Sequence, residues 1–504
     1  MNNLIQIIGT HPIREDIKAQ YEARGYGIIT ADSFATLDEA VEFRELCVLP
    51  QKGIADHDTL QVLETYAAHR PETPEGQSKP ICHLLLHDKM TLWLLQTIEL
   101  YPEIHKKFEI YAFTMEDQWA KNVFCSLGGN NAIYPPLDRE KIDAVSNKTV
   151  HLVIAGLSDL GESLAIHASL VAHFPNYVRN QALRTRITIV DKDLTARKNA
   201  FIQRYVHLFD HSHYRCIDLK QRQMTLRHEP LYHASREDFV DVEWEFVDGD
   251  FYDPIMLHKL QHWGDDKEQL LTIALCDADS QINLDRAFAL PKNIYQNGIT
   301  VLVSTEQAGI IEKVRETENY RCLYPIGMID CGYDISLPLL QMAKRLNYFY
   351  TCSYGQEGTP TDMPLEDVEA AWRNIGSFSM RYSNMYNVMT VATKMRSLGH
   401  DEKDWDKFFA LTQEEVATLS AVEHNRWSVD RLILGFRPPT DAERKEIREH
   451  IELKDAYKKK KVHYDLCSYR ELGVDKTGKD VRLYDYDLIA CIPLIAQSFK
   501  EAQP

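Results

Sequence analysis

One short segment combines two glycines and a serine in a spacing that can hold a phosphate. Gly156, Ser158 and Gly161 lie between an apolar run and a helical pattern. The glycines allow a tight turn and close packing of helix on strand, and free amides at the helix start can bind an anion. Ser158 takes the place of the middle glycine of G-x-G-x-x-G, and its Cβ narrows the space for a pyrophosphate. We therefore expect a nucleotide-binding loop formed by Gly156, Ser158, Asp159, Leu160 and Gly161.

A carboxylate suited to a ribose follows at the end of the next apolar run. Arg186 to Val190 ends at Asp191, which can accept hydrogen bonds from an adenosine ribose, and Lys192 comes directly after it. Asp191 lies 35 positions after Gly156, whereas the usual spacing is about 20. We attribute the difference to an insertion around Phe174 to Leu183. The alternative interpretation is a helix cap followed by an ordinary surface acid.

A second group of polar and aromatic residues lies near the C-terminus. Glu423, His424, Arg426 and Trp427 share a predicted helix that continues to Arg431. An aromatic ring can stack on a base, and an arginine can pair with a phosphate. Only a subset can face one site, because Trp427 shares a helix face with Glu423 and Arg431 but not with its direct neighbours. The alternative is structural, with Trp427 in the core and with Glu423 and His424 capping the helix or paired.

Three further residues complete the candidate site for a second ligand. Arg381 and Asn384 lie at a predicted helix start, where a cation and an amide suit either an N-cap or an anion contact. His463 follows the basic cluster Lys458 to Lys461, which we interpret as a solvated helix end, with a phosphate or partner contact as the alternative.

Two more motifs accompany the glycine segment in a fixed order. Phe246 to Pro254 contains Val-Asp-Gly-Asp-Phe-Tyr-Asp, and Ile273 to Leu284 contains Cys-Asp-Ala-Asp. Together the three motifs resemble TrkA-N (RCK-type) domains, the nucleotide-binding modules of potassium-uptake and potassium-channel regulators. The resemblance implies that the middle of the chain binds NAD or an adenine nucleotide. It extends the candidate binding residues to Asp250, Phe251 and Asp277.

The C-terminal group also resembles a known family. The order is Glu423 to Trp427, then Gly435-Phe436, then Lys461 to Leu472 and Tyr486-Asp487. It is similar to the ryanodine-receptor (RyR) repeat domain as found in bacterial proteins. Phe436 replaces the usual tryptophan, and the segment Pro438 to Lys461 is longer than expected. The resemblance implies a terminal domain that recognises a nucleotide-like or protein ligand.

Apolar runs separated by helical patterns position these residues. The pattern predicts an α/β class of tandem Rossmann-like parallel-sheet domains, followed by a mainly α, RyR-like C-terminal domain. The expected divisions are 1–143, 148–334, a helical connector at 335–411, and 412–504. The cluster Gly128-Gly129-Asn130-Asn131 marks the first boundary. In the first domain Ile8 to Pro12 replaces the glycine loop, so we interpret that domain as a degenerate copy that serves assembly.

Composition narrows the class of partner. A formal charge of -18 over 504 residues repels polyphosphate backbones, which argues against general nucleic-acid binding. The most apolar run, Leu488 to Ala496, is shorter than the roughly 18 residues that cross a bilayer. With no export signal and no C-x-x-C pair, we expect a cytoplasmic protein with reduced thiols, no membrane insertion and no metal site.

These observations favour a sensor over a catalyst. The sequence contains no nucleophile elbow, P-loop lysine or H-E-x-x-H motif, so we assign no catalytic residue. We expect a nucleotide-binding regulator that forms a homodimer. The combination of domains suggests, by analogy, a role in bacterial nucleotide signalling or defence. One alternative is a cytosolic subunit that regulates potassium transport through a membrane-protein partner. The other is an NAD-dependent enzyme or a nucleotide hydrolase.

Overall fold

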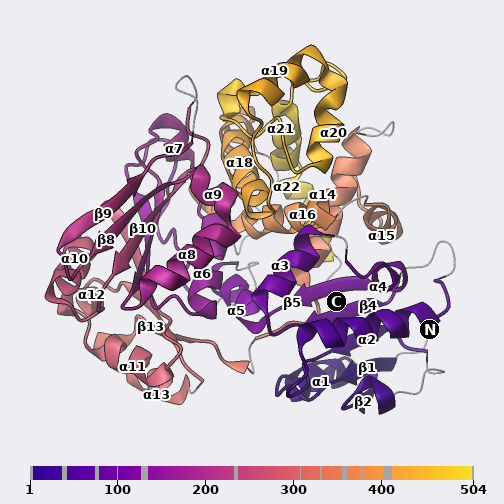
Figure 1. Cartoon of the computed structure of the whole chain (residues 1–504), viewed down its shortest axis with the longest axis horizontal. Coiled ribbons are helices and arrows are strands. Elements are labelled where there is room, and N and C mark those ends of the chain that lie inside the picture. The colour runs from indigo at the N-terminus through magenta and orange to yellow at the C-terminus, as the bar shows by residue number, and fades with distance from the viewer. Residues whose placement is uncertain are drawn as a thin grey trace.

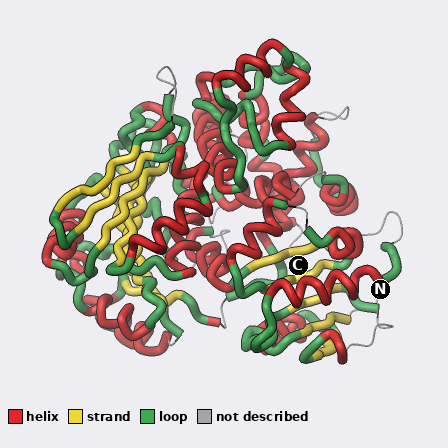
Figure 2. Tube along the Cα trace, viewed as in Figure 1, coloured by secondary structure: helices red, strands yellow, loops and turns green. Residues whose placement is uncertain are grey.

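A computed structural model shows two sheet-containing units and a helical region (Figure 1). It describes residues 4–36, 42–73, 79–98, 100–125, 134–231, 237–306, 308–329, 332–354, 360–375, 378–400 and 411–501. The predicted boundary cluster Gly128 to Asn131 lies outside these residues. Figure 2 shows strands in the first two units only, with helices forming the third region. The predicted α/β class with a mainly helical C-terminal region is confirmed.

The first unit has five parallel strands in the order β2-β1-β3-β4-β5. The strands are β1 (Leu4–Ile8), β2 (Gly27–Ala31), β3 (Glu45–Val48), β4 (Ile81–Leu85) and β5 (Glu109–Phe113), and the helices are α1 (Arg14–Ala23), α2 (Asp56–His69), α3 (Lys89–Thr97), α4 (Pro102–Lys107) and α5 (Met115–Phe124). This is the second common order of doubly wound sheets. Strands β1, β3, β4 and β5 are almost fully buried, as parallel strands covered on both faces are, whereas the edge strand β2 is mostly half-buried or exposed.

The middle unit has an eight-stranded sheet in the order β13-β12-β11-β6-β7-β10-β8-β9. Its strands are β6 (Thr149–Ala155), β7 (Thr185–Asp191), β8 (His213–Asp218), β9 (Gln223–His228), β10 (Val242–Asp248), β11 (Gln269–Leu275), β12 (Thr300–Ser304) and β13 (Leu323–Ile326). Without β8 and β9, the order is that of a dinucleotide-binding Rossmann sheet. The two units therefore share an architecture but not a strand order.

The helices of the middle unit explain the long spacing between the glycine loop and Asp191. They are α6 (Asp159–Val171), α7 (Pro175–Arg179), α8 (Leu194–Arg204), α9 (Val206–Asp210), α10 (Pro254–Asp265), α11 (Ser280–Phe288), α12 (Lys292–Gln296) and α13 (Ala308–Arg315). The extra helix α7 lies where the sequence predicted an insertion. Helix α6 packs against β6 and β7 and also contacts α5, α16 and α18. The glycine loop therefore precedes a helix that touches every part of the molecule.

The helical region contains α14 (Pro338–Tyr354), α15 (Leu365–Arg373), α16 (Phe378–Met389), α17 (Val391–Ser397), α18 (Gln413–Ile433), α19 (Asp441–Glu449), α20 (Lys454–Lys459), α21 (Arg482–Ala490) and α22 (Ile492–Glu501). Helix α18 begins where Thr412 and Glu415 form a reciprocal capping box. It ends before Gly435, whose φ of 80° suits a glycine helix stop. Helices α16 and α17 are separate helices that meet at Thr390.

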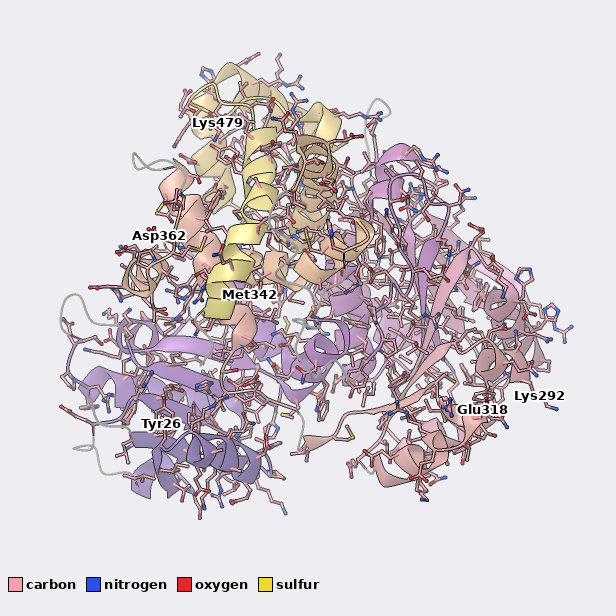
Figure 3. The ribbon with its side chains drawn as sticks, turned by 180° about the vertical axis from the view of Figure 1, so that it is seen from behind. Tyr26, Lys292, Glu318, Met342, Asp362 and Lys479 are labelled. Carbon is pink, nitrogen blue, oxygen red and sulfur yellow. The ribbon has the colours of Figure 1, made fainter. Side chains whose placement is uncertain are left out.

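Two long helices of this region belong to different hydrophobic cores. Leu340 and Leu346 of α14 pack with Ile5 and Phe113 of the first unit. Leu432 of α18 lies in the core of the middle unit. Seen from behind, Met342 lies where the helical region meets the first unit, while Lys479 lies at the far end of the helical region (Figure 3). The helical region thus joins the two α/β units.

The two α/β units also contact each other directly through α5 and α6. His167 Nε2 of α6 lies 2.8 Å from Asp117 Oδ1 of α5, and Lys121 pairs with the same carboxylate at 2.6 Å. Trp119 Nε1 donates to the Met328 carbonyl at 2.8 Å. Within the described ranges, no helix is both long and apolar enough to cross a membrane.

We predict that Gly161→Ala destabilises the protein strongly. A Cβ at residue 161 would lie 2.3 Å from the Gly156 carbonyl oxygen, so the helix and the loop must separate. Overpacking of this kind costs about 1–3 kcal/mol. Gly309→Ala in α13 is the matched control, because nothing lies within 4 Å of its Cβ position. Urea unfolding followed by circular dichroism checks both, and equal midpoints for the two variants would show that the close packing is absent.

Candidate functional site

The glycine loop has the backbone geometry of a phosphate-binding turn. Gly156 follows β6 with a φ of 104°, and a Cβ there would lie 2.7 Å from the Asp277 amide nitrogen. Gly161 lets α6 approach the Gly156 carbonyl. Strands β6 and β11 are neighbours in the sheet, and the order of the strands along the sheet reverses direction between them. Ligands of doubly wound sheets bind at such a switch point.

Side chains of the protein itself occupy part of this loop. The Asp191 Oδ2 atom accepts the Leu157 amide at 2.8 Å and pairs with Arg197 at 3.1 Å. Ser158 caps α6 by accepting the Gly161 amide at 3.2 Å. Asp159 Oδ1 lies 2.5 Å from Lys89 Nζ of the first unit. A phosphate at the start of α6 would therefore meet a carboxylate, and a ribose would compete with the Leu157 amide for Asp191.

The other residues predicted for this site are spread around the same sheet edge. Lys192 and Asp250 are exposed, and Asp250 accepts the Tyr252 amide at 2.9 Å. Phe251 is buried in the core, with the Arg286 guanidinium 5.5 Å from its ring centre. Leu160 is also buried.

Arg286 connects these groups and was missed in the sequence. It lies 3.3 Å from Asp277 and donates to the Ala155 carbonyl at 3.3 Å. It sits inside α11 without a motif around it, so only the fold brings it to the loop.

A pocket of about 320 Å³ lies in the helical region. Its walls come from α14, α16, α18, α20 and α21 and from the turns between the last two helices, and they include Asn347, Tyr350, Met380, Ser383, Asn384, His424, Trp427, Arg431, Lys454, Asp455, Lys458, Val462, His463, Tyr464, Asp465, Asp475, Lys476, Val481, Tyr484, Asp485 and Leu488. This size suits one small molecule. Five of the predicted second-ligand residues line it, namely Asn384, His424, Trp427, Arg431 and His463.

Arg431, Lys454, Lys458 and His463 form one side of the pocket, which we call the cation corner. Burial, and then the charges of Lys458, Arg431 and Lys454, hold the pKa of His463 well below its usual value. Burial and Arg431 also lower the pKa of Lys458. Lys454 pairs with Asp465 at 3.1 Å, whereas Lys458 has no ion pair within the described residues. Part of each pKa depression comes from the neighbouring positive charges, which a bound anion would offset, whereas Asp455 and Asp465 act on Lys458 in the opposite direction.

Tyr350, Asp475, Tyr484 and Asp485 form a second group on the pocket wall, which we call the carboxylate corner. Burial, and then the charges of Asp485 and Asp475, raise the pKa of Tyr350 to about 12. The Tyr484 hydroxyl donates to Asp475 Oδ2 at 2.5 Å. Arg431 acts on the pKa of Tyr350 in the opposite direction, so positive and negative side chains line the same pocket.

His424 joins the carboxylate corner to the aromatic wall. Its Nε2 donates to the Cys467 carbonyl at 2.9 Å, and its Nδ1 lies 3.3 Å from Asp485 Oδ2. Burial disfavours the imidazolium, but the hydrogen bond and charge of Asp485 outweigh burial and raise the pKa of His424. The ring stacks on Trp427 at 5.4 Å, and His463 meets Trp427 edge-on at 4.8 Å. Trp427 is therefore a packed wall of the pocket, which leaves little of its face for a base.

Asn347 contributes a buried donor that has no partner. It is 2% exposed and lines the pocket from α14. Its Oδ1 accepts from Asn384 Nδ2 at 3.4 Å, whereas its Nδ2 has no hydrogen bond. An unpaired buried amide costs about 1–3 kcal/mol, which a ligand acceptor would offset. The sequence gives no local signal for Asn347, because it lies on a helix far from the C-terminal motif.

Three residues predicted for the second ligand do not line this pocket. Glu423 is fully buried, where Lys394 Nζ lies 2.6 Å from Oε2 and Arg426 Nη2 lies 2.7 Å from Oε1. Arg426 also pairs with Asp430 at 2.7 Å. Arg381 lies over the Trp372 ring, at 5.5 Å from its centre. Glu423 and Arg426 thus form a buried ion network that fixes α18. For Glu423, this is the structural pairing that the alternative interpretation of the helix expected.

Comparison with known protein families, with characterised proteins and with solved structures finds no match for this chain. The resemblances to TrkA-N and RyR domains therefore stay predictions.

We predict that Glu423→Gln lowers the stability at pH 7 by about 3–5 kcal/mol, because it leaves Lys394 and Arg426 without their buried counter-charge. Arg426 and Lys394 overcome the effect of burial and lower the pKa of Glu423 to about 2, below its value of 4.5 in an unfolded chain. The carboxylate therefore stabilises the fold fully above about pH 5, and this contribution is lost as the pH falls towards 2.

Urea unfolding between pH 7 and pH 3 measures this effect. The wild type should lose stability on acidification more steeply than the Glu423→Gln variant. Glu452→Gln, at a side chain that is 71% exposed, is the control and should follow the wild type. Parallel pH profiles for the wild type and Glu423→Gln would contradict the assignment.

Proposed function

We propose that this protein is a nucleotide-responsive sensor. The pocket of the helical region binds an anionic, nucleotide-like ligand, and the middle unit binds NAD or an adenine nucleotide at its glycine loop. The observation that carries the proposal is the cation corner, where Lys458 has no ion pair in the described part of the chain and faces a pocket of about 320 Å³. A regulator with two ligand sites needs no catalytic group, and we assign none.

The cation corner favours a phosphate-bearing ligand for a physical reason. Arg431 and Lys454 provide guanidinium and ammonium donors, and Lys458 adds a charge that forms no ion pair with a described residue, although Asp455 and Asp465 lie near enough to act on it. Charge-assisted hydrogen bonds to phosphate are about twice as strong as neutral ones. The neutral His463 beside them can donate one N–H or accept one hydrogen bond. A single phosphate group therefore satisfies this corner better than a neutral molecule.

Support for a nucleotide in the middle unit comes from the strand order and from Gly156. Both are features of a dinucleotide-binding unit, and the amides of Asp159 and Leu160 at the helix start have no intrahelical acceptor. The Asp159 carboxylate and the Asp191 contact with Leu157 oppose a phosphate there. The loop therefore supports a weaker site than the pocket does, and binding requires local rearrangement.

Contacts of α18 give the proposal its regulatory part. The helix carries His424, Trp427 and Arg431 on the pocket wall, and it packs on α6, α7 and α9 of the middle unit. A ligand that holds α18 in one position favours one arrangement of the two regions. Homodimer formation, a cytoplasmic location and a role in bacterial nucleotide signalling remain predictions, as do the potassium-transport and enzyme alternatives.

Lys458→Ala should weaken binding of AMP by about tenfold, because one charge-assisted contact is lost. Isothermal titration of the full chain with AMP measures this. Lys459→Ala is the matched control, since Lys459 is exposed on the same helix but does not line the pocket. The proposal fails at this site if both variants bind AMP as tightly as the wild type, or if the wild type does not bind it.

Ser158→Gly should strengthen binding of NAD several-fold. It removes the Cβ that narrows the loop, and replacing a serine N-cap by glycine costs only a few tenths of a kcal/mol. Titration with NAD in the Lys458→Ala background isolates the middle unit from the pocket. The proposal for the glycine loop fails if Ser158→Gly does not change the affinity for NAD. It also fails if NAD binding is lost altogether in the Lys458→Ala background.

A further inference from the structure

The carboxylate corner and Asn347 select a feature of the ligand that the cation corner does not. Asp485 Oδ2 is engaged by His424, but its Oδ1 makes no hydrogen bond with any described residue. A carboxylate oxygen accepts hydrogen bonds and does not donate them. Beside it, α14 supplies the Asn347 Nδ2, a buried donor without an acceptor. The pocket therefore offers one free acceptor and one free donor from two neighbouring helices.

Helices α14 and α21 place these two groups on the wall of the same pocket. The two helices contact each other. Tyr350 lies one turn after Asn347 on α14, and the charge of Asp485 raises the pKa of Tyr350. Asn384 on α16 keeps Asn347 Oδ1 occupied, so the Asn347 amide offers only its donor to a ligand. The pocket therefore presents a hydrogen-bond acceptor on α21 and a hydrogen-bond donor on α14.

We propose that the pocket selects a nucleotide whose base carries an amino group next to a ring-nitrogen acceptor, as adenine does, and rejects a 6-oxo purine. This inference rests on the proposed function, since the phosphate must occupy the cation corner. The amino group donates to Asp485 Oδ1, and the ring nitrogen accepts from Asn347 Nδ2. Hypoxanthine held in the same orientation presents the opposite pattern, a carbonyl acceptor next to an N–H donor, and pairs with neither protein group unless the base turns over.

The size of the discrimination follows from the unpaired groups. A site built to hydrogen-bond a substrate rejects an analogue that cannot form those bonds, because buried polar groups then lose solvent without gaining a partner. AMP and IMP share the ribose and the phosphate and differ at this edge of the base. We therefore expect AMP to bind at least tenfold more tightly than IMP.

Isothermal titration of the full chain with AMP, IMP and ribose 5-phosphate tests the inference. The expected result is tight binding of AMP, with IMP and ribose 5-phosphate similar to each other and at least tenfold weaker. Lys458→Ala should weaken all three by a similar factor. Equal affinities for AMP and IMP, both reduced by Lys458→Ala, would overturn the inference and leave the proposed function standing. Failure of all three to bind would overturn both.

Asn347→Leu separates base recognition from phosphate binding. The substitution keeps the branching and the number of heavy atoms, although leucine is larger; it removes the unpaired donor and gives up only the 3.4 Å contact with Asn384. It should reduce the AMP to IMP preference to within about twofold and leave binding of ribose 5-phosphate unchanged. A thermal melt establishes that the variant is folded. If folded Asn347→Leu protein still prefers AMP over IMP, Asn347 does not recognise the base. If the variant does not fold, the ratio of the AMP and IMP affinities of the wild type decides the inference.

Discussion

The buried guanidinium of Arg426 determines how α18 is placed. It lies between Glu423 and Asp430, and Asp430 in turn accepts from Arg431 at 2.8 Å. A buried charge without its partners costs several kcal/mol, so this network permits few positions of the helix. Because Arg431 reaches the pocket wall, the same network that holds α18 against α16 and α17 also orients a cation towards the ligand. Stability and binding geometry thus depend on one set of ion pairs.

The pocket lies between two helices that belong to different cores. Helix α14 shares its core with the first unit, and Lys344 ties it to Glu109 at the start of β5 at 3.2 Å. Helix α18 shares its core with the middle unit. A ligand that contacts Asn347 and Arg431 together would therefore stabilise the present arrangement of both units. This gives a physical route from occupancy of one pocket to the position of the glycine loop, without a catalytic step.

The sequence predicted the well-buried parallel strands because long burial selects mostly apolar residues. The run at β6 is apolar except for Thr149 and His151 and is almost fully buried, so its position could be predicted. Strands β8 and β9 were missed, since β9 is exposed along nearly its whole length and its residues are mostly polar. Strand β13 was also missed, because it is short and contains Pro325. Strand order could not be predicted, since it depends on crossovers that leave no local pattern.

Prediction of the pocket was partial for a related reason. Helical spacing grouped Trp427 with Arg431, and both residues line the pocket. The same spacing also placed Glu423 with them, but the Glu423 side chain belongs to the buried ion network. Asn347 and Asp485 come from helices that are distant in the sequence and meet only through tertiary packing. No short motif could have identified them.

A crystal structure of the full chain grown with AMP tests the central claim most directly. We expect density for the phosphate beside Lys458 and Arg431, with the adenine edge between Asn347 and Asp485. A pocket filled by water alone, in crystals whose AMP is bound elsewhere or not at all, would contradict it.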